Sequence, residues 1–549
     1  MLSTRDLAGA VGARATAERI PLSAARCGWR EVAVCSAIAL AICAGRVVQV
    51  GGMQFYNDSY QYLSVAKNLR DHGAVATSLV YFDTERARGV VPAPLTTFPP
   101  GYPLLIALLS KLGLSLEHAA LLLSMAGFLA VLPLLLVAGR SLGLTPTATR
   151  VAMLVWAVSA QSTLYGICLL TEGLFSAVLL GAVVLLVRTD AQSGRWRIPA
   201  GCALLAVGYG IRYATLLLIA GAHAYALVHL VTVRHRRRAW LAGLALCDGL
   251  VSIVLVRNLI VTGTWQGGNT KAFHNPVLYT VKRAGVTLAD LLFGEHLGVL
   301  RFPSVLFAAA TAAALVALAL LALRERRRIA AALAEERLLL VVLPAVYFAA
   351  VFYLCVATVV WFSTRLFVPL IPICGLVLGV VLTALTDDRG RLPRAAAAAT
   401  ALFAAGFVAV NLAQAFVPPH LAPHRWAARA LALPTADGRP LATWLGEHLP
   451  RGARLLAMEA QATGYLVDRP AIAISGTRFS DIAWTEARMR EDMQAFGAEW
   501  AVVYPDAVAT GSEDDLGSPF LQDLAQRRIP AWLEVVAENP RALVLRVRR

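Results

Sequence analysis

Long apolar runs separated by short polar segments dominate the chain up to about residue 416. A run of about 20 apolar residues is long enough to cross the hydrocarbon core of a bilayer as a helix. Such runs occupy approximately 31–50, 119–139, 150–169, 173–187, 198–212, 213–233, 239–257, 304–323, 338–360, 366–385 and 395–416. The pattern predicts an all-α polytopic membrane domain of about 11 transmembrane helices.

Clusters of arginine between these runs orient the helices, because cytoplasmic loops carry an excess of basic residues. The basic segments 234–238 and 324–328 lie on the side of the Arg-rich N-terminus only if residues 198–233 form two short helices that turn at Arg212. The predicted arrangement is a cytoplasmic tail at 1–30, a membrane domain at 31–416 with outer loops at 51–117 and 258–303, and a last helix that leads outward.

Beyond residue 416 the hydrophobic pattern changes to that of a soluble protein. Helix-like stretches at 440–449, 484–496 and 517–527 alternate with β-like runs at 454–458, 500–504, 533–537 and 542–547. This alternation predicts a small α/β domain over 417–549, outside the cytoplasm. In the first outer loop, the apolar stretch after residue 98 is too short to cross a bilayer and predicts an interfacial or re-entrant helix.

Composition agrees with a membrane protein, since 58% of the 549 residues are hydrophobic and 15% are charged. The net charge of +16 comes from short clusters between apolar runs, which argues for topology and against nucleic-acid binding. The eight cysteines lie in or beside apolar segments without metal-ligand spacing and predict small core residues. The polar, Arg-rich first 30 residues do not resemble a cleavable signal peptide, so the first apolar run is expected to be an anchor.

Asp58 opens a short amphipathic segment in the first outer loop, directly after the first span. With Gln61 three residues later, it fits a capping box, in which the side chain only satisfies backbone N–H groups. The functional alternative is that Asp58 faces the membrane surface as a general base toward an acceptor hydroxyl. The same loop holds Tyr60, Tyr62 and Tyr102, which are candidate substrate-binding residues.

Glu172 interrupts an apolar stretch and is expected between the third and fourth spans. A carboxylate in the membrane interior costs roughly 2.5–3.5 kcal/mol, so it is expected at a turn or facing a polar cavity. A simple hairpin turn is one interpretation. The other is a second catalytic acid, since the predicted topology places Glu172 on the same side as Asp58.

Three arginines, Arg212, Arg257 and Arg365, are predicted at outer helix ends, against the positive-inside bias. Each side chain either extends to the interface alone or binds an anion, and together they suggest a donor phosphate site. Lys271 and His274 in the second long outer loop are candidate donor or substrate contacts, although a single histidine is more often a surface residue. No metal-ligand set is evident, so no cofactor is predicted.

Three segments resemble the GT-C glycosyltransferases, especially the branch of protein O-mannosyltransferases and lipid A aminoarabinose transferases. They are Asp58-Ser59-Tyr60-Gln61-Tyr62 with the following Ala66-Lys67-Asn68-Leu69, Phe98-Pro99-Pro100-Gly101-Tyr102-Pro103-Leu104-Leu105, and Arg365-Leu366-Phe367-Val368-Pro369-Leu370-Ile371-Pro372. The order of helices, the long first outer loop and the final outer α/β domain also agree, so the resemblance covers most of the chain.

The resemblance implies an inverting transfer in which Asp58 acts as base on the acceptor while polyprenyl phosphate leaves the sugar. Glu172 falls where the family has a second acidic residue. Aminoarabinose transferases carry a phosphate-binding lysine before the Pro-Pro pair, whereas this chain has Phe98, so that role is expected to shift to Arg212 or Arg365. The acidic residue that helps to bind metal in that relative has no match here, which puts a divalent metal site in doubt.

The function expected from these features is transfer of a sugar from an undecaprenyl-type phosphate to an envelope lipid, glycan or protein. The chain is expected in the bacterial inner membrane, with its site on the periplasmic side. A lipid-linked donor agrees with the lack of a nucleotide-binding loop such as GxGxxG or GxxxxGK[ST] in a strand-to-helix context. The alternatives are a lipid or glycan flippase, and a non-catalytic envelope assembly protein with a sensing outer domain.

The predicted topology can be checked with reporter fusions. A reporter fused after Arg238 is expected to be active only in the cytoplasm, and one fused after Val417 only outside it. The opposite result at either position would contradict the prediction that Asp58, Glu172 and Arg365 lie on the same side of the membrane.

Overall fold

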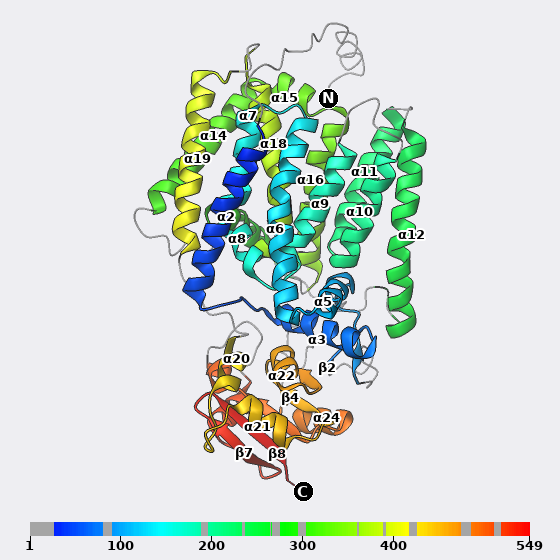
Figure 1. Cartoon of the computed structure of the whole chain (residues 1–549), viewed down its shortest axis with the longest axis vertical. Coiled ribbons are helices and arrows are strands. Elements are labelled where there is room, and N and C mark those ends of the chain that lie inside the picture. The colour runs from blue at the N-terminus through cyan, green and yellow to red at the C-terminus, as the bar shows by residue number, and fades with distance from the viewer. Residues whose placement is uncertain are drawn as a thin grey trace.

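The computed structural model describes residues 27–80, 91–187, 196–232, 236–263, 265, 275–294, 304–358, 362–387, 391–416, 425–473, 485–509 and 518–548. Figure 1 shows a bundle of helices with a smaller C-terminal part, which contains a sheet, at one end. Two short helices, α3 (Asn57–His72) and α5 (Gly101–Lys111), lie where the bundle meets that part. The order of layers is therefore bundle, first-loop helices, and sheet.

Within the described residues, seven helical segments are long and apolar enough to cross a membrane. They are α2 (Trp29–Val50), α6 (Leu116–Ser141), α12 (Arg237–Thr262), α14 (Ser304–Arg324), α16 (Leu339–Ala357), the segment Thr364–Ala384 formed by α17 (Thr364–Phe367), η4 (Val368–Leu370) and α18 (Ile371–Ala384), and α19 (Arg394–Ala415). Shorter apolar helices are α5, α9 (Glu172–Leu186), α10 (Arg197–Ile211) and α11 (Thr215–Thr232). The chain is a multi-pass membrane protein.

The span predicted at 150–169 is wrong as a single helix, because it is divided into α7 (Pro146–Val158) and α8 (Ala160–Ile167). Ser159 interrupts it with an extended ψ of 126°, and its side chain accepts a hydrogen bond from the backbone N–H of Ser162. The side chain of Asn411 in α19 accepts a hydrogen bond from the N–H of Ala160 at 2.8 Å. Polar side chains thus satisfy the backbone groups that a continuous helix would have paired.

The loops contain more regular structure than the hydrophobic pattern predicted. The segment 258–303, which was predicted to be an outer loop, includes α13 (Val277–Phe293). The basic linker after α14 includes α15 (Arg326–Ala332) and η3 (Glu335–Leu338). In the first loop, α5 occupies the stretch that was predicted to be a short interfacial helix. The described residues of the first loop also form the two-residue strands β1 (Ala76–Thr77), β2 (Leu79–Val80) and β3 (Ala93–Pro94).

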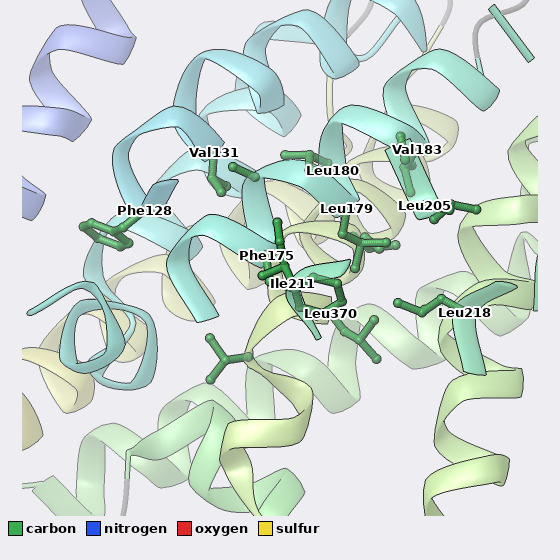
Figure 2. Packing of buried hydrophobic residues seen from close by; sticks show 14 of the residues in the cluster. Phe128, Val131, Phe175, Leu179, Leu180, Val183, Leu205, Ile211, Leu218 and Leu370 are labelled. Carbon is green, nitrogen blue, oxygen red and sulfur yellow. The ribbon is translucent and has the colours of Figure 1, made fainter. Parts of the chain in front are cut away.

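The core of the bundle is built around α6 and α9. Figure 2 shows Phe128 and Val131 of α6 and Phe175 and Leu179 of α9 among the side chains of this core, and these four side chains are almost completely buried. Within a bilayer, helices associate through close packing because the lipid surroundings are as apolar as the side chains. The α6–α9 contact is therefore the packing that fixes the position of α9.

The C-terminal part contains a six-stranded sheet in the order β2-β5-β4-β6-β8-β7. Its strands are β4 (Leu455–Ala457), β5 (Ala471–Ala473), β6 (Trp500–Val503), β7 (Leu533–Asn539) and β8 (Ala542–Val547), with β2 supplied by the first loop. Neighbouring strands from β2 to β6 run parallel, whereas β8 is antiparallel to both β6 and β7. The helices are α20 (Arg425–Ala432), α21 (Leu441–His448), α22 (Ala460–Val467), α24 (Glu486–Phe496), α25 (Pro505–Ala509) and α26 (Pro519–Ala525).

Helix α22 docks on α3 and connects the sheet to the first loop. The hydroxyl of Tyr465 donates to Glu117 Oε1 at 2.5 Å, and the rings of Tyr465 and Tyr60 lie 6.1 Å apart. At the other end of the contact, Lys67 forms a 2.5 Å ion pair with Asp468. Because β2 also pairs with β5, the first loop is held by both a strand and a helix of the C-terminal part.

Glu459, between β4 and α22, is a buried carboxyl group in this part. Its Oε2 accepts a hydrogen bond from the N–H of Ala427 at 2.7 Å, whereas its buried Oε1 has no hydrogen-bond partner in the described part of the chain. Burial disfavours the charged form and raises the pKa of Glu459 to about 8, although the bond from Ala427 acts in the opposite direction. The folded protein thus keeps a proton that the unfolded chain releases above about pH 4.3.

This proton makes stability depend on pH. Between about pH 4.3 and the folded-state pKa of about 8, the folded state binds more protons than the unfolded state, so stability falls as pH rises. We expect a slope of up to about 1.4 kcal/mol per pH unit from this group. Glu459→Gln cannot ionise, so the unfolding midpoint of the C-terminal part is expected to depend less on pH between pH 5 and 8 than in wild type. The midpoint is measured by thermal unfolding of the full chain.

The matched control is Glu447→Gln, because the side chain of Glu447 in α21 is exposed in the same part of the chain. This control is expected to keep the wild-type slope. A wild-type midpoint that rises across the same pH range would contradict the assignment.

Candidate active site

Two glycines bring α6 and α9 close enough to fix the start of α9. A Cβ on Gly173 would lie 2.3 Å from the backbone oxygen of Ser124, and one on Gly127 would lie 2.4 Å from the backbone of Leu174. The Ser124 hydroxyl also donates to the Leu170 carbonyl at 2.7 Å. The backbone just before and after Glu172 is thereby held against α6.

Glu172 is the first residue of α9 and has no exposed surface. Arg212, between α10 and α11, donates from Nη1 to Glu172 Oε1 at 2.5 Å and to the Thr171 hydroxyl at 3.2 Å. Arg365 also donates to Glu172 Oε1, through its Nε. A carboxylate at a helix N-terminus and an arginine at a helix C-terminus are each favoured by the helix dipole. The turn interpretation of Glu172 is therefore incomplete, because its carboxylate binds two arginines.

Arg365 connects the two predicted acids. Its Nη1 donates to Asp58 Oδ2, so one guanidinium bridges Asp58 in the first loop and Glu172 in the bundle. The side chains of Asp58 and Arg365 are 25% and 22% exposed, and that of Arg212 is 13% exposed. We call Asp58, Glu172, Arg212 and Arg365 the ion-pair cluster. Its formal charge is zero.

The capping interpretation of Asp58 is wrong. Helix α3 begins at Asn57, and the side chain that caps it belongs to Ser59, whose Oγ accepts from the N–H of Tyr56 at 3.0 Å. Asp58 lies in the first turn and directs its carboxylate to Arg365. The carboxylate is thus part of the ion-pair cluster.

Arg257 lies apart from the ion-pair cluster. Its guanidinium donates to the backbone carbonyls of Leu95 at 2.7 Å and Val75 at 3.4 Å, and to the side chain of Asn258 at 3.1 Å. These contacts connect α12 to the first loop. Of the three arginines grouped by topology, the structure therefore brings together Arg212 and Arg365.

The three candidate tyrosines of the first loop, Tyr60, Tyr62 and Tyr102, are buried packing residues. Tyr62 packs edge-on against Phe98 and Tyr102, with ring centroids 5.1 and 5.2 Å away. The Tyr102 hydroxyl donates to the Ala120 carbonyl, whereas Tyr60 stacks on a phenyl ring at 5.2 Å and packs against the C-terminal part. Burial, and then the neighbouring Asp58 charge, raise the pKa of Tyr62, so it stays a neutral phenol. Lys271 and His274 lie outside the described residues.

Tyr347 of α16 was missed by the sequence analysis. Its hydroxyl donates to the carbonyl of Leu366 at 2.8 Å, and its ring packs edge-on against Phe367, so it holds the backbone beside Arg365. A tyrosine inside an apolar run gave no signal of this contact. Across the described part of the chain, no three His, Cys, Asp or Glu side chains are grouped as a metal site.

The buried ion pairs predict a large effect of Glu172→Ala. This change leaves Arg212 and Arg365 without their shared carboxylate, which typically costs about 3–5 kcal/mol for a buried pair. We expect a clearly lower thermal unfolding midpoint of the ligand-free protein in detergent. Glu325→Ala, which removes an exposed ion pair with Arg328, is the control and should change stability by less than about 0.5 kcal/mol. Equal midpoints for both variants would contradict the proposed ion pairs.

No protein-family model and no curated protein matches the chain. Among solved structures, ArnT from Cupriavidus metallidurans bound to undecaprenyl phosphate matches with a TM-score of 0.56 and 14% identity, over 95% of this chain and 98% of that one. The Archaeoglobus fulgidus oligosaccharyltransferase AglB, in complex with an inhibitory peptide and a dolichol-phosphate, matches with a TM-score of 0.53 and 11% identity. That match covers 92% of this chain and 72% of AglB.

The mycobacterial arabinofuranosyltransferase AftD also matches, with a TM-score of 0.51 and 15% identity, over 96% of this chain and 42% of AftD. All three proteins are GT-C glycosyltransferases. Their similarity spans both the membrane bundle and the C-terminal part, because more than nine-tenths of this chain is covered in each case. The chain therefore has the GT-C fold.

Proposed function

We propose that this protein is an inverting membrane glycosyltransferase that moves a sugar from a polyprenyl-phosphate donor to an envelope acceptor. The observation that carries the proposal is the ion-pair cluster, in which four segments far apart in sequence place two carboxylates and two arginines together. Partly buried carboxylates and arginines are suited to proton transfer and to binding a phosphate. The GT-C fold, with a neighbour bound to undecaprenyl phosphate, supports this use of the cluster.

In the proposed reaction, a hydroxyl of the acceptor attacks the anomeric carbon of the donor sugar. The hydroxyl proton passes to the Asp58 carboxylate, a bond forms between the acceptor oxygen and the anomeric carbon, and the bond from that carbon to the phosphate oxygen breaks. Polyprenyl phosphate leaves with the electron pair of the broken bond. Attack opposite to the leaving group inverts the configuration at the anomeric carbon.

The arginines stabilise the charge that develops on the departing phosphate. Guanidinium groups form directional, charge-assisted hydrogen bonds to phosphate oxygens, and they are effective where water is partly excluded. Arg212 and Arg365 have side chains that are 13% and 22% exposed, which leaves each accessible to a ligand. Glu172 holds both arginines in place and is the second acid of the site. Tyr347 positions Arg365 through the backbone of Leu366.

We propose that the site lies on the periplasmic face of a bacterial inner membrane, together with the first loop and residues 417–549. The fold supports this grouping because α3, which carries Asp58, contacts α22 of the C-terminal part. The acceptor would then approach from the envelope, while the polyprenyl chain stays in the bilayer. Nucleotide sugars, which are cytoplasmic, could not serve such a site.

A flippase is the alternative function. Transporters commonly bind substrates near the bilayer midplane between broken helices. Here Glu172 begins α9, Arg212 follows the last residue of α10, and Arg365 lies in the short helix before α18. The charged groups thus occupy helix ends at one end of the bundle, which favours a reaction at the membrane surface.

The decisive experiment compares the envelope lipids and glycans of a deletion strain after complementation with wild type, Asp58→Asn or Asp71→Asn. Wild type and Asp71→Asn are expected to restore the glycosylated product found by mass spectrometry. Asp58→Asn is expected to lower transfer by about 10²–10⁴-fold, because removal of a general base typically has that effect. Asp71 is a suitable control because it lies on the same helix and pairs with the neighbouring Arg70.

Expression should be equal for the three proteins, and each should show a cooperative unfolding transition. Full activity of Asp58→Asn at equal expression would refute the assignment of Asp58. An unchanged anomeric configuration in the product would refute the inverting mechanism.

A further inference from the structure

We propose that Arg365 is shared between Asp58 and the donor phosphate, so that donor binding releases the carboxylate that acts on the acceptor. This inference rests on the proposed function, because it assumes that the ion-pair cluster binds a polyprenyl phosphate. It adds an order of events, in which the donor binds first and the base becomes accessible as a result. It also identifies Arg365 as the residue that couples the two substrates.

The first argument is the charge of the ion-pair cluster. Without donor, the two carboxylates balance the two arginines, and each carboxylate has an arginine partner. A phosphodiester brings one further negative charge into partly buried surroundings. Burying an unpaired charge is costly, so the phosphate competes with the carboxylates for the two arginines.

The second argument is the difference between the two carboxylates. Glu172 is completely buried and accepts hydrogen bonds from both arginines, so its release would leave a charge without water or a partner. Among the described residues, Asp58 has a single arginine partner, and its side chain is 25% exposed. Asp58 can therefore exchange Arg365 for water or substrate at a much lower cost. Asp58 is the carboxylate that loses its contact with Arg365 when the phosphate binds.

The third argument is the geometry at Arg365. Its Nη1 binds Asp58 while its Nε stays on Glu172, so the guanidinium can change one partner without losing the other. The hydroxyl of Tyr347 holds the carbonyl of the next residue, Leu366, at 2.8 Å. The backbone beside Arg365 is thus fixed, and exchange at Nη1 requires only a small movement of the side chain.

Release of Asp58 from Arg365 frees a carboxylate oxygen for the reaction. In the donor-free protein, Asp58 Oδ2 is occupied by an N–H donor of Arg365. Once the phosphate accepts that donor, the same oxygen can accept the hydrogen of an acceptor hydroxyl. The arginine that leaves Asp58 is then on the leaving group, where negative charge develops during transfer.

The competition can be measured with farnesyl phosphate as the probe and farnesol, which lacks the phosphate, as its control. Asp58→Asn removes the competing charge, so farnesyl phosphate should bind the variant about tenfold more tightly than wild type, within the usual range of coupling between sites. Affinity for farnesol should not change. Binding to the full chain in nanodiscs is measured by isothermal titration calorimetry, with Asp71→Asn as the matched variant that keeps wild-type affinity.

Asp58→Ala is a second variant of the same kind and guards against a folding defect specific to asparagine, and both are checked by their unfolding midpoints. Equal or weaker binding of farnesyl phosphate by the folded Asp58 variants would overturn the inference while leaving a phosphate site in place. Farnesyl phosphate that binds no better than farnesol to any of the proteins would instead overturn the proposed donor site. Tighter binding to Asp71→Asn as well would show a general charge effect and overturn the role of Arg365.

Discussion

The buried carboxylate of Glu172 is the group on which the candidate site depends. A charge without exposed surface is tolerated only with compensating partners, and here two arginines from different segments fill that role. The two arginines need Glu172 in turn, since each guanidinium is also mostly removed from water and requires a negatively charged partner. As a result, the start of α9, the α10–α11 turn and the short helix α17 must meet at one point. Asp58 joins this point through Arg365 from outside the bundle.

Close helix packing makes that meeting possible. At Gly127 and Gly173, α6 and α9 approach so closely that a single added carbon would overlap backbone atoms of the other helix. In a bilayer, where hydrophobic burial gives little preference for one helix neighbour over another, such small residues decide which helices pack together. The position of the first residue of α9, and hence of Glu172, follows from this packing. Apolar packing and ionic contacts therefore support the same geometry at adjacent residues.

Periodicity and charge indicated the helical class of the chain, the turn at Arg212 and several elements of the C-terminal part, such as α21, α24, β4 and β6, close to their observed ranges. These features depend on local composition. The break at Ser159 was not predicted, because the freed N–H of Ala160 donates to the side chain of Asn411, which is about 250 residues away in sequence. Helix α13 was overlooked because its apolar residues lie within a loop of mixed composition.

The sequence grouped Asp58, Glu172, Arg212 and Arg365 by sidedness. Sidedness does not distinguish them from Arg257, which binds two backbone carbonyls and the side chain of Asn258. The packing of the first loop determines which arginines bind carboxylates and which binds backbone carbonyls. The tyrosines illustrate the same limit, since Tyr60, Tyr62 and Tyr102 belong to the same loop as Asp58 yet are buried as packing residues. The residue type and the position in the chain suggested that these tyrosines bind substrate. Their actual contacts depend on segments that are distant in sequence and that bury their side chains.

The edge strand β2 has a consequence for the synthesis of the protein. Leu79 pairs with Ala471, so about 390 residues must be translated before the first loop can meet its partner. At 5–20 residues per second, this interval lasts roughly 20 to 80 s, during which the membrane helices can already insert. Helix α3 reaches its final support only when the last part of the chain arrives. The loop that bears Asp58 is thus fully supported only when the C-terminal sheet is complete. If translation stops before β5 is made, β2 has no partner strand.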